Sequence, residues 1–421
     1  MPAERAAVAG PAQRGVPTFY IEVVDNLGVV DIYAKSGAEV GAQLAGPTSV
    51  RVGRHAPITL PIPVCPQKAT TAALPPAAGG AGAGWVRIRA PIDRCAGRAR
   101  LEEATRAIAR IGRSVTAASI GELKDIRCQT CGASILSEDM QNADFPCNVR
   151  DLPSAHWSEL VDCWMCHPEE DTLNVNPELM FAFEPDTESA AVRDGPDPTG
   201  GPGPSPSSGV HMWVGNTFGL VPIALTRGLS AKVVPLGDKE RFHNAYSPLY
   251  CASCAGMVGE AGRVGRRRTA KLYLHRIGIR NTTATLTAGL SQVACSELLS
   301  HAGAHAIYKF VIEGRVSCQP AALVHLVGWN ADILASPAPD STADASATPV
   351  FERCAKVLFL GPGDKDFDAV SKQWLAGDAA ELVAFLDEDC ACLLELLAAN
   401  SRRIPPQLRT MAGMTRSFLA L

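Results

Sequence analysis

Two Cys-x-x-Cys pairs carry the clearest chemical signal in this sequence. The first pair is Cys128 and Cys131, followed by Gly132, and the second pair is Cys251 and Cys254. A Cys-x-x-Cys turn directs two thiolates at one ion, and two such turns supply the four soft ligands that tetrahedral zinc prefers. The glycine suits the positive φ that such a turn often needs. The four cysteines therefore predict a structural zinc site.

The alternatives to zinc are a redox pair and a set of buried thiols. A redox Cys-x-x-Cys usually opens a helix that follows a strand, and neither pair lies in that setting. The stretch between the pairs is far longer than in a usual zinc ribbon. A shared ion would therefore close a long loop, which gives the metal a large effect on stability. We favour zinc over both alternatives.

A third group with chemical potential is Cys166 and His167, which lie in the run Trp-Met-Cys-His-Pro. The residues from Ser154, as a helix cap, to Trp164 predict a helix with one apolar face, which Pro168 ends. Three interpretations stay open. One of the two residues completes a zinc site, or Cys166 beside the base His167 forms a thioester, or both residues are structural. Adjacent residues rarely both bind one ion, so at most one is a ligand.

The chain has 14 cysteines, and the others carry less information. The N-terminus lacks the apolar core of a secretion signal, which indicates a reducing compartment. In that setting cysteines are better interpreted as metal ligands or thiols than as disulfides. Cys390 and Cys392 lie in a Leu/Ala-rich stretch, where we expect them to pack in a core.

Composition places limits on the class of protein. The chain has 421 residues, of which 47% are hydrophobic and 19% are charged, a globular composition. Its net charge of −4 argues against a broad nucleic-acid binder. No uninterrupted apolar run is long enough to span a membrane. We therefore expect neither a membrane nor a nucleic acid as a direct partner.

Shifts in composition divide the chain into four parts. Residues 1–16 are interpreted as a disordered tail, residues 17–115 as a β-rich N-terminal unit, and residues 116–265 as a zinc-knuckle region. That region contains a disordered Gly/Pro-rich insertion at 185–209. Residues 266–421 form an α+β C-terminal region with mixed α and β elements. Strands and helices fall in separate blocks, which favours an α+β fold with a central zinc-stapled region.

Local patterns predict individual elements. Phe19, Ile21 and Val23 alternate with more polar neighbours, which is strand periodicity, and the Asn-Leu-Gly run that follows predicts a turn before a return strand. Helical spacing predicts helices over 101–111 and over 379–399.

The segment from Leu152 to Pro168 resembles the central motif of the HECT-like ubiquitin-conjugating-enzyme-binding ligase family. That motif has Pro-Ser-Glu-Asn-Trp, then Leu-Val, then Trp-x-Cys-His-Pro, and here Ala155 and His156 replace the Glu-Asn pair. Further stretches resemble the family in its own order, at both Cys-x-x-Cys pairs, 214–221, 269–273 and 405–419. Together these motifs are specific for the family, although each motif alone would be weak evidence for it.

The resemblance implies an enzyme, a ubiquitin-protein ligase that binds a ubiquitin-conjugating enzyme (E2) and ubiquitin and promotes autoubiquitination. It also implies cyclins or mRNA 3′-end processing factors as protein partners, and a cytoplasmic and nuclear location. A HECT-type transfer needs a cysteine that accepts ubiquitin as a thioester, with Cys166 beside His167 as first candidate and Cys390 as second. The alternative is a non-catalytic scaffold or stabilising partner of the 3′-end processing machinery.

Overall fold

The structure is a computed structural model in which the chain forms two compact units. The first unit comprises residues 1–111 and 306–421, and the second comprises residues 112–305. The N-terminal and C-terminal stretches therefore share one unit. The residues that the structure describes are 19–35, 42–52, 57–75, 84–99, 115–137, 148–152, 211–231, 247–264, 267–335, 350–377 and 379–421.

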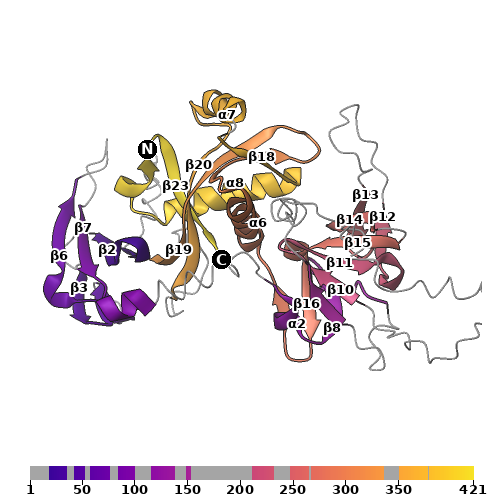
Figure 1. The fold of residues 1–421 in the computed structure, drawn as a ribbon, viewed down its shortest axis with the longest axis horizontal. Helices are drawn as coiled ribbons and strands as arrows, with labels where there is room; N and C mark the ends of the chain where they lie inside the picture. The colour runs from indigo at the N-terminus through magenta and orange to yellow at the C-terminus, as the bar shows by residue number, and fades with distance from the viewer. Residues whose placement is uncertain are drawn as a thin grey trace, which may run out of the picture. The chain divides into compact units, whose positions relative to one another are not determined.

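A ten-stranded sheet is the frame of the first unit (Figure 1). Its main path runs β22-β23-β20-β19-β1-β2-β7-β6, and β18 and β21 extend it from β19. Its strands are β1 (Phe19–Val24), β2 (Val29–Lys35), β6 (Thr70–Leu74), β7 (Trp85–Pro91), β18 (Lys309–Gly314), β19 (Pro320–Ala335), β20 (Glu352–Leu360), β21 (Glu381–Phe385), β22 (Thr410–Met411) and β23 (Met414–Ala420).

The predicted N-terminal hairpin is present, and both of its faces are buried. Strands β1 and β2 pair around a short turn at Asp25–Leu27, and Gly28 leaves this turn with φ +60°. Ile21 and its alternating neighbours pack in one core. The opposite face carries Tyr20 and Glu22, which are also buried. The alternation therefore marks two different buried surfaces rather than a core side and a solvent side.

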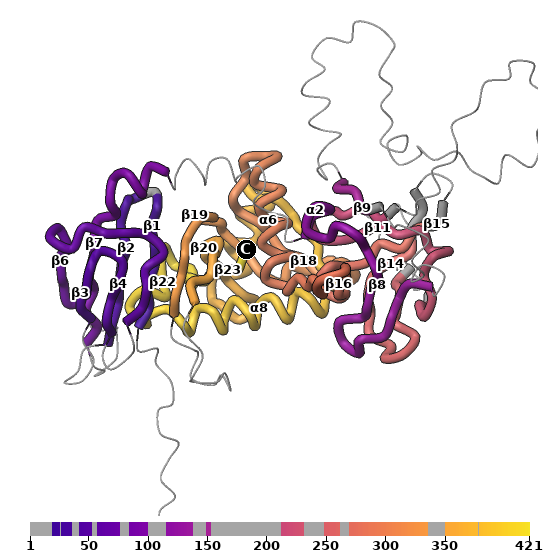
Figure 2. The backbone as a smooth tube through the Cα atoms, turned by 90° about the horizontal axis from the view of Figure 1, so that it is seen from below, coloured from indigo at the N-terminus to yellow at the C-terminus, as the bar shows by residue number. Residues whose placement is uncertain are grey.

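A small sheet covers the Ile21 face of this hairpin. It consists of β3 (Ala42–Gly46), β4 (Ser49–Val52) and β5 (Ile58–Thr59), paired in the order β3-β4-β5. Val50 and Val52 of β4 belong to the same buried cluster as Ile21, so the two layers share one core. Figure 2 shows β4 beside the strands of the larger sheet.

The C-terminal half of the first unit adds helices α7 (Phe367–Ala376) and α8 (Asp387–Arg402). Phe367 and Trp374 of α7 pack against Val311 of β18 and Leu323 of β19. On α8, the Leu397 carbonyl accepts a 2.7 Å hydrogen bond from the Ser417 hydroxyl of β23. Both helices therefore cover the sheet.

The helix predicted over 379–399 begins later than expected, and this part of the prediction is wrong. Residues 381–385, Glu-Leu-Val-Ala-Phe, form β21 instead, which pairs in parallel with β18. Val383 and Phe385 alternate with exposed residues, a pattern that suits a half-buried strand. The apolar residues of 379–399 fit helical spacing, so the local pattern favoured a helix over a strand. The strand depends on pairing with β18, a tertiary contact that local spacing does not predict. Helix α8 then starts at Asp387.

The second unit contains two sheets around one core. A seven-stranded sheet has the order β12-β13-β14-β15-β11-β10-β9, and a three-stranded sheet has the order β17-β16-β8. The strands are β8 (Leu123–Cys128), β9 (Asn148–Asp151), β10 (His211–Val214), β11 (Phe218–Pro222), β12 (Leu229–Ala231), β13 (Ser247–Cys251), β14 (Met257–Val264), β15 (Arg267–Tyr273), β16 (Ile277–Asn281) and β17 (Thr285–Thr287).

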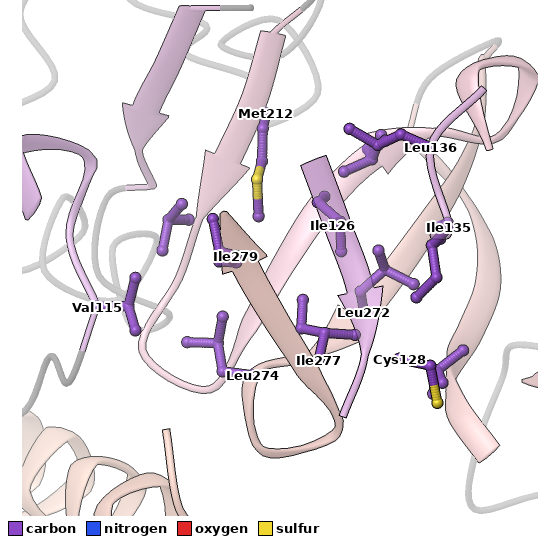
Figure 3. Close-up of a cluster of buried hydrophobic side chains, with 14 of the residues drawn as sticks. Val115, Ile126, Cys128, Ile135, Leu136, Met212, Leu272, Leu274, Ile277 and Ile279 are labelled. Atoms are coloured by element: carbon purple, nitrogen blue, oxygen red, sulfur yellow. The ribbon is translucent and has the colours of Figure 1, made fainter. Parts of the chain in front are cut away.

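Two helices, α2 (Ala117–Ile120) and α6 (Leu290–His305), belong to this unit. Helix α2 is short, and a capping box formed by Thr116 and Ser119 supplies its first hydrogen bonds. Ile126, Ile277 and Leu272 lie in the core that joins the two sheets, and Figure 3 shows Cys128 at the edge of this cluster. The first metal-ligand candidate is thus anchored in the core.

These elements confirm an α+β fold that is rich in strands, with a cysteine cluster in the central part of the chain. The tail at 1–16, the helix predicted over 101–111 and the insertion at 185–209 lie outside the described residues. Among the described helices, none combines the length and apolar character that a membrane crossing requires.

Candidate metal centre

The first Cys-x-x-Cys pair closes the end of β8. The Cys128 carbonyl accepts a 2.8 Å hydrogen bond from the Gly132 amide, and the Cys128 amide donates to the Ala133 carbonyl. Gly132 has a φ of +74°, a conformation that glycine adopts without a steric cost. Cys128 is 1% exposed while Cys131 is exposed, so one ligand faces the core and the other faces outward.

The second pair repeats this arrangement at the end of β13. The Cys251 carbonyl accepts a 2.8 Å bond from the Ala255 amide, and the Cys251 amide donates to the Gly256 carbonyl. Ala255 has a φ of +57°, where the first turn has its glycine. Cys251 is buried and Cys254 is half-buried. The two turns, here called the first and second knuckles, thus share one backbone hydrogen-bond pattern.

The four thiols converge on one point. The Sγ atoms of Cys128 and Cys254 lie 3.7 Å apart, and those of Cys131 and Cys251 lie 3.6 Å apart. All four sulfurs lie within 4.8 Å of one another. Two thiolates on one tetrahedral zinc, each bonded at about 2.3 Å, are separated by about 3.8 Å. The donor set and its spacing therefore fit a tetrathiolate metal ion.

The electrostatics of the cluster also fit a cation. Burial raises the pKa of the Cys251 thiol, but hydrogen bonds from the amides of Cys254 and Ser253 lower it, and the net pKa falls to about 7. The Ala133 amide lowers the pKa of Cys131, whereas desolvation and the three neighbouring thiols raise it to about 12. Four adjacent thiolates repel one another, and a bound cation would remove this repulsion.

A buried carboxylate braces the first knuckle, and no motif in the sequence marks it. Asp125 of β8 is 2% exposed. Its carboxylate accepts a 2.8 Å bond from Arg127 Nε and a 2.6 Å bond from the Ser134 hydroxyl. Arg127 also reaches the Gly132 carbonyl at 3.4 Å. These bonds tie both sides of the knuckle together, which orients its cysteines. Only Asp125's position two residues before Arg127 hinted at this role.

The other predicted site residues have different outcomes. Cys166 and His167 lie outside the described residues. Cys390 lies in α8 and is 3% exposed, with its thiol 3.4 Å from the Glu313 carbonyl of β18. Burial, together with Asp387 and Asp389, raises the pKa of the Cys390 thiol to about 12. A buried, protonated thiol is a poor nucleophile, so this arrangement supports core packing for Cys390.

The fold and the site define an α+β protein whose knuckles, at the ends of two core strands, form a four-cysteine cluster that could hold a metal ion. The family model described as HECT-like ubiquitin-conjugating enzyme (E2)-binding matches residues 21–415, nearly the whole chain. The chain therefore belongs to this E2-binding family. Comparison with curated proteins and with solved structures gave no match.

Proposed function

We propose that the chain is a ubiquitin-protein ligase that binds a charged E2 and promotes ubiquitin transfer, including its own ubiquitination. The observation that carries this proposal is the family match over residues 21–415. Membership of a family described as E2-binding supports a role in the ubiquitin pathway. The four-cysteine cluster supports a fold held in shape by a metal, which a docking protein needs.

We assign the metal as zinc and its role as structural. All four donors are sulfur, and zinc accepts four thiolates in a tetrahedron. When bound, zinc would supply cross-linking between the two knuckles rather than a reactive group, since four protein ligands leave no open position. Metal analysis of the purified chain should find about one zinc per chain. Absence of metal, or iron in its place, would contradict this assignment.

We propose Cys166 as the ubiquitin acceptor, with His167 as the adjacent base. The Cys166 thiolate would attack the thioester carbonyl of the E2-bound ubiquitin, and the E2 thiolate would leave and take up a proton. A substrate lysine amine would then attack the new thioester and release the Cys166 thiol. His167 would first take the proton of the Cys166 thiol to form the thiolate and pass it to the departing E2 thiolate; in the second step it would take the proton of the attacking amine and pass it to the departing Cys166 sulfur. The sequence neighbourhood of these two residues supports the assignment.

A reconstituted mixture of activating enzyme, a panel of E2 proteins, ubiquitin and the full chain tests this function. We expect the chain to bind at least one E2, to accelerate ubiquitin transfer, and to form an adduct that a thiol reductant removes. Cys166→Ala should abolish that adduct while zinc content stays unchanged. Cys392→Ala, which alters an exposed thiol in α8, is the matched control.

The outcomes separate the parts of the proposal. Transfer without a reducible adduct would overturn the thioester step and leave a ligase that presents the charged E2 directly. Zinc loss in Cys166→Ala would make that residue a ligand. Failure to bind or stimulate any E2 would overturn the ligase proposal, and partner binding without transfer would then indicate a scaffold.

We also propose cyclins or mRNA 3′-end processing factors as protein partners, in the cytoplasm and the nucleus. The resemblance of the sequence motifs to the family supports this assignment. Affinity purification from fractionated cells tests it, and recovery of neither class of partner from either fraction would contradict it.

A further inference from the structure

On β7 of the first unit, two arginines share one buried carboxylate. Arg87 and Arg89 lie two positions apart on the strand, so they project from the same face of the sheet. The Oδ1 atom of Asp31 accepts hydrogen bonds from the Nε atoms of both, at 3.1 and 2.8 Å, and its Oδ2 atom accepts a 2.7 Å bond from Arg89 Nη2. One negative charge therefore holds two guanidinium groups side by side.

A second pair of cations lies next to the first. Glu22 is the cross-strand neighbour of Asp31, and such neighbours are about 5 Å apart at Cβ. The Glu22 carboxylate lies 2.7 Å from Lys356 Nζ and 3.7 Å from Arg416 Nη2. The four cations, here called the cationic cluster, are Arg87, Arg89, Lys356 and Arg416. They meet only two carboxylates, so these six side chains carry a net charge of +2.

The cations lie outside the carboxylates and keep hydrogen-bond donors to spare. The Asp31 side chain is 5% exposed, whereas those of Arg87 and Arg89 are 29% and 38% exposed. Arg87 donates to the described part of the chain only through Nε, which leaves both of its terminal nitrogens, and Nη1 of Arg89, for an external acceptor. The bonds to Asp31 fix the guanidinium planes, so these donors are oriented in advance.

The net charge and the spare donors favour a doubly charged oxyanion. A phosphate monoester carries about −1.5 to −2 charges at pH 7 and offers three strong acceptor oxygens, which guanidinium groups bind in pairs. A nucleic-acid backbone carries one charge per phosphate, and single strands also need exposed aromatic rings on which bases can stack. Tyr20 and Tyr33, on the same face of the sheet, are buried. A phosphate monoester therefore fits this surface better than a nucleic acid does.

We propose that the cationic cluster is a binding site for a dianionic phosphate group, either free phosphate or a phosphorylated side chain. Asp31 and Glu22 are its positioning residues, because they hold the cations together from below. The site lies within the first unit, apart from the cysteine centre in the second unit. It does not depend on the proposed ligase activity.

Calorimetric titration of the full chain with inorganic phosphate, and with a phosphoserine peptide, tests this site at physiological chloride concentration. We expect saturable binding at one site per chain. Arg87→Gln should weaken it by about tenfold, because it removes a charge and a pair of donors while Arg89 still pairs with Asp31. Arg353→Gln is the matched control and should leave binding unchanged, since Arg353 is similarly exposed and pairs with buried Asp332 at one cation per carboxylate.

Two further probes identify the ligand. The unphosphorylated peptide and dimethyl phosphate, which has a single charge, should each bind at least about tenfold more weakly than their dianionic counterparts. Tighter binding of the phosphoserine peptide than of inorganic phosphate would assign the site to a phosphorylated protein, and equal binding would assign it to the free ion. Arg87→Lys, which keeps the charge and loses the paired donors, should have an intermediate affinity.

Unchanged circular dichroism spectra and urea unfolding midpoints would show that the arginine variants fold. No saturable binding of either phosphate probe would overturn the proposal. Dimethyl phosphate binding as tightly as inorganic phosphate, or equal losses of affinity in Arg87→Gln and Arg353→Gln, would overturn it as well.

Discussion

Ala255 and Gly132 occupy equivalent positions in the two knuckles. Glycine suits the backbone conformation at this position, and alanine does not. Both residues have a positive φ, +57° for Ala255 and +74° for Gly132. A side chain in this left-handed region clashes with the following carbonyl, which costs roughly 1 kcal/mol for alanine. The second knuckle therefore holds a small strain that the first one avoids, and the hydrogen bonds around Cys251 must offset it.

Replacing Ala255 by glycine should stabilise the second unit by about 0.5–1 kcal/mol, since it relieves this strain. Thermal unfolding of the zinc-loaded chain measures the effect as a small rise in Tm. Ala252→Gly is the control, because Ala252 lies in the same knuckle, is exposed, and lacks a positive φ. Equal effects of the two substitutions, or destabilisation by Ala255→Gly, would show that the backbone is unstrained.

At the scale of elements, the loop between β18 and β19 repeats the backbone hydrogen bonds of the knuckles around a carboxylate. The Gly314 carbonyl accepts a bond from the Cys318 amide, and the Gly314 amide donates to Gln319. The amides of Val316 and Ser317 then donate to the Asp387 carboxylate at the start of α8. In the second knuckle, the amides at these two positions point at the Cys251 thiol. A carboxylate thus takes the place of a thiolate.

The position of the Asp387 carboxylate explains why the loop has Gly314 where the knuckles have their first cysteine. A Cβ atom on Gly314 would overlap the Asp387 carboxylate. The carboxylate itself is held by charge-assisted hydrogen bonds. Although desolvation raises the pKa of Asp387, the bonds from Ser317 and Val316 outweigh it, and the net pKa lies below its usual value.

Asp387→Asn should destabilise the first unit by about 1 kcal/mol at pH 7, because a neutral side chain makes weaker bonds to the two amides. A group whose pKa is lowered on folding contributes stability above its unfolded pKa of about 3.9, and that contribution falls away at lower pH. The difference between wild type and variant in urea unfolding should therefore shrink as the pH falls below about 4. Asp368→Asn, in the exposed first turn of α7, is the control.

The large sheet buries a polar row on the face opposite the Ile21 core. Glu22 is 4% exposed and pairs across the strands with Asp31, which is also buried. Lys356 Nζ lies 2.7 Å from Glu22, and Arg89 lies 2.7 Å from Asp31. Two adjacent carboxylates inside a sheet would repel each other, so these cations make the strand pairing possible.

Lys356→Met should cost about 2–3 kcal/mol in the free energy of unfolding, because it leaves the Glu22 carboxylate buried with weaker partners. Arg416 at 3.7 Å and the Tyr20 hydroxyl at 3.2 Å remain and limit the loss. The double variant Glu22→Gln/Lys356→Met should lose less than the sum of the single variants. Lys372→Met, at an exposed position of α7, serves as reference, and strict additivity would contradict the coupling.

At the scale of the whole molecule, the two units have separate cores. The four cysteines of the two knuckles all belong to the second unit. A metal bound by the four cysteines would close a loop between β8 and β13 within that unit, so its binding energy would add to the stability of the second unit. The first unit draws its stability from its own sheets, around Ile21 and around Val311.

Chelation of the metal should therefore act on one unit. Hydrogen exchange after metal removal should lose protection in β8, β13 and β16, while β1, β2 and β19 keep theirs. The same pattern should follow acidification through the range in which the thiolates take up protons, because protons compete with the metal. Uniform loss of protection over both units would show that the metal stabilises the whole chain as one cooperative body.

The sequence by itself determined the local features of this protein. Donor identity and turn chemistry depend on consecutive residues. The metal-ligand candidates in the two Cys-x-x-Cys pairs, the N-terminal hairpin and the family resemblance could therefore all be predicted from the sequence. The burial of Glu22 and the brace by Asp125 could not be predicted, because a lone carboxylate in a strand gives no sign of which layer will cover it.

Only the tertiary structure decided which distant parts meet. It brings Cys128 within 3.7 Å of Cys254, joins the N-terminal and C-terminal stretches in one unit, and turns residues 381–385 into a strand beside β18. The physical reason is the same in each case. Pairing between segments far apart in the chain depends on the packing of every layer between them, and short-range periodicity carries no record of that packing.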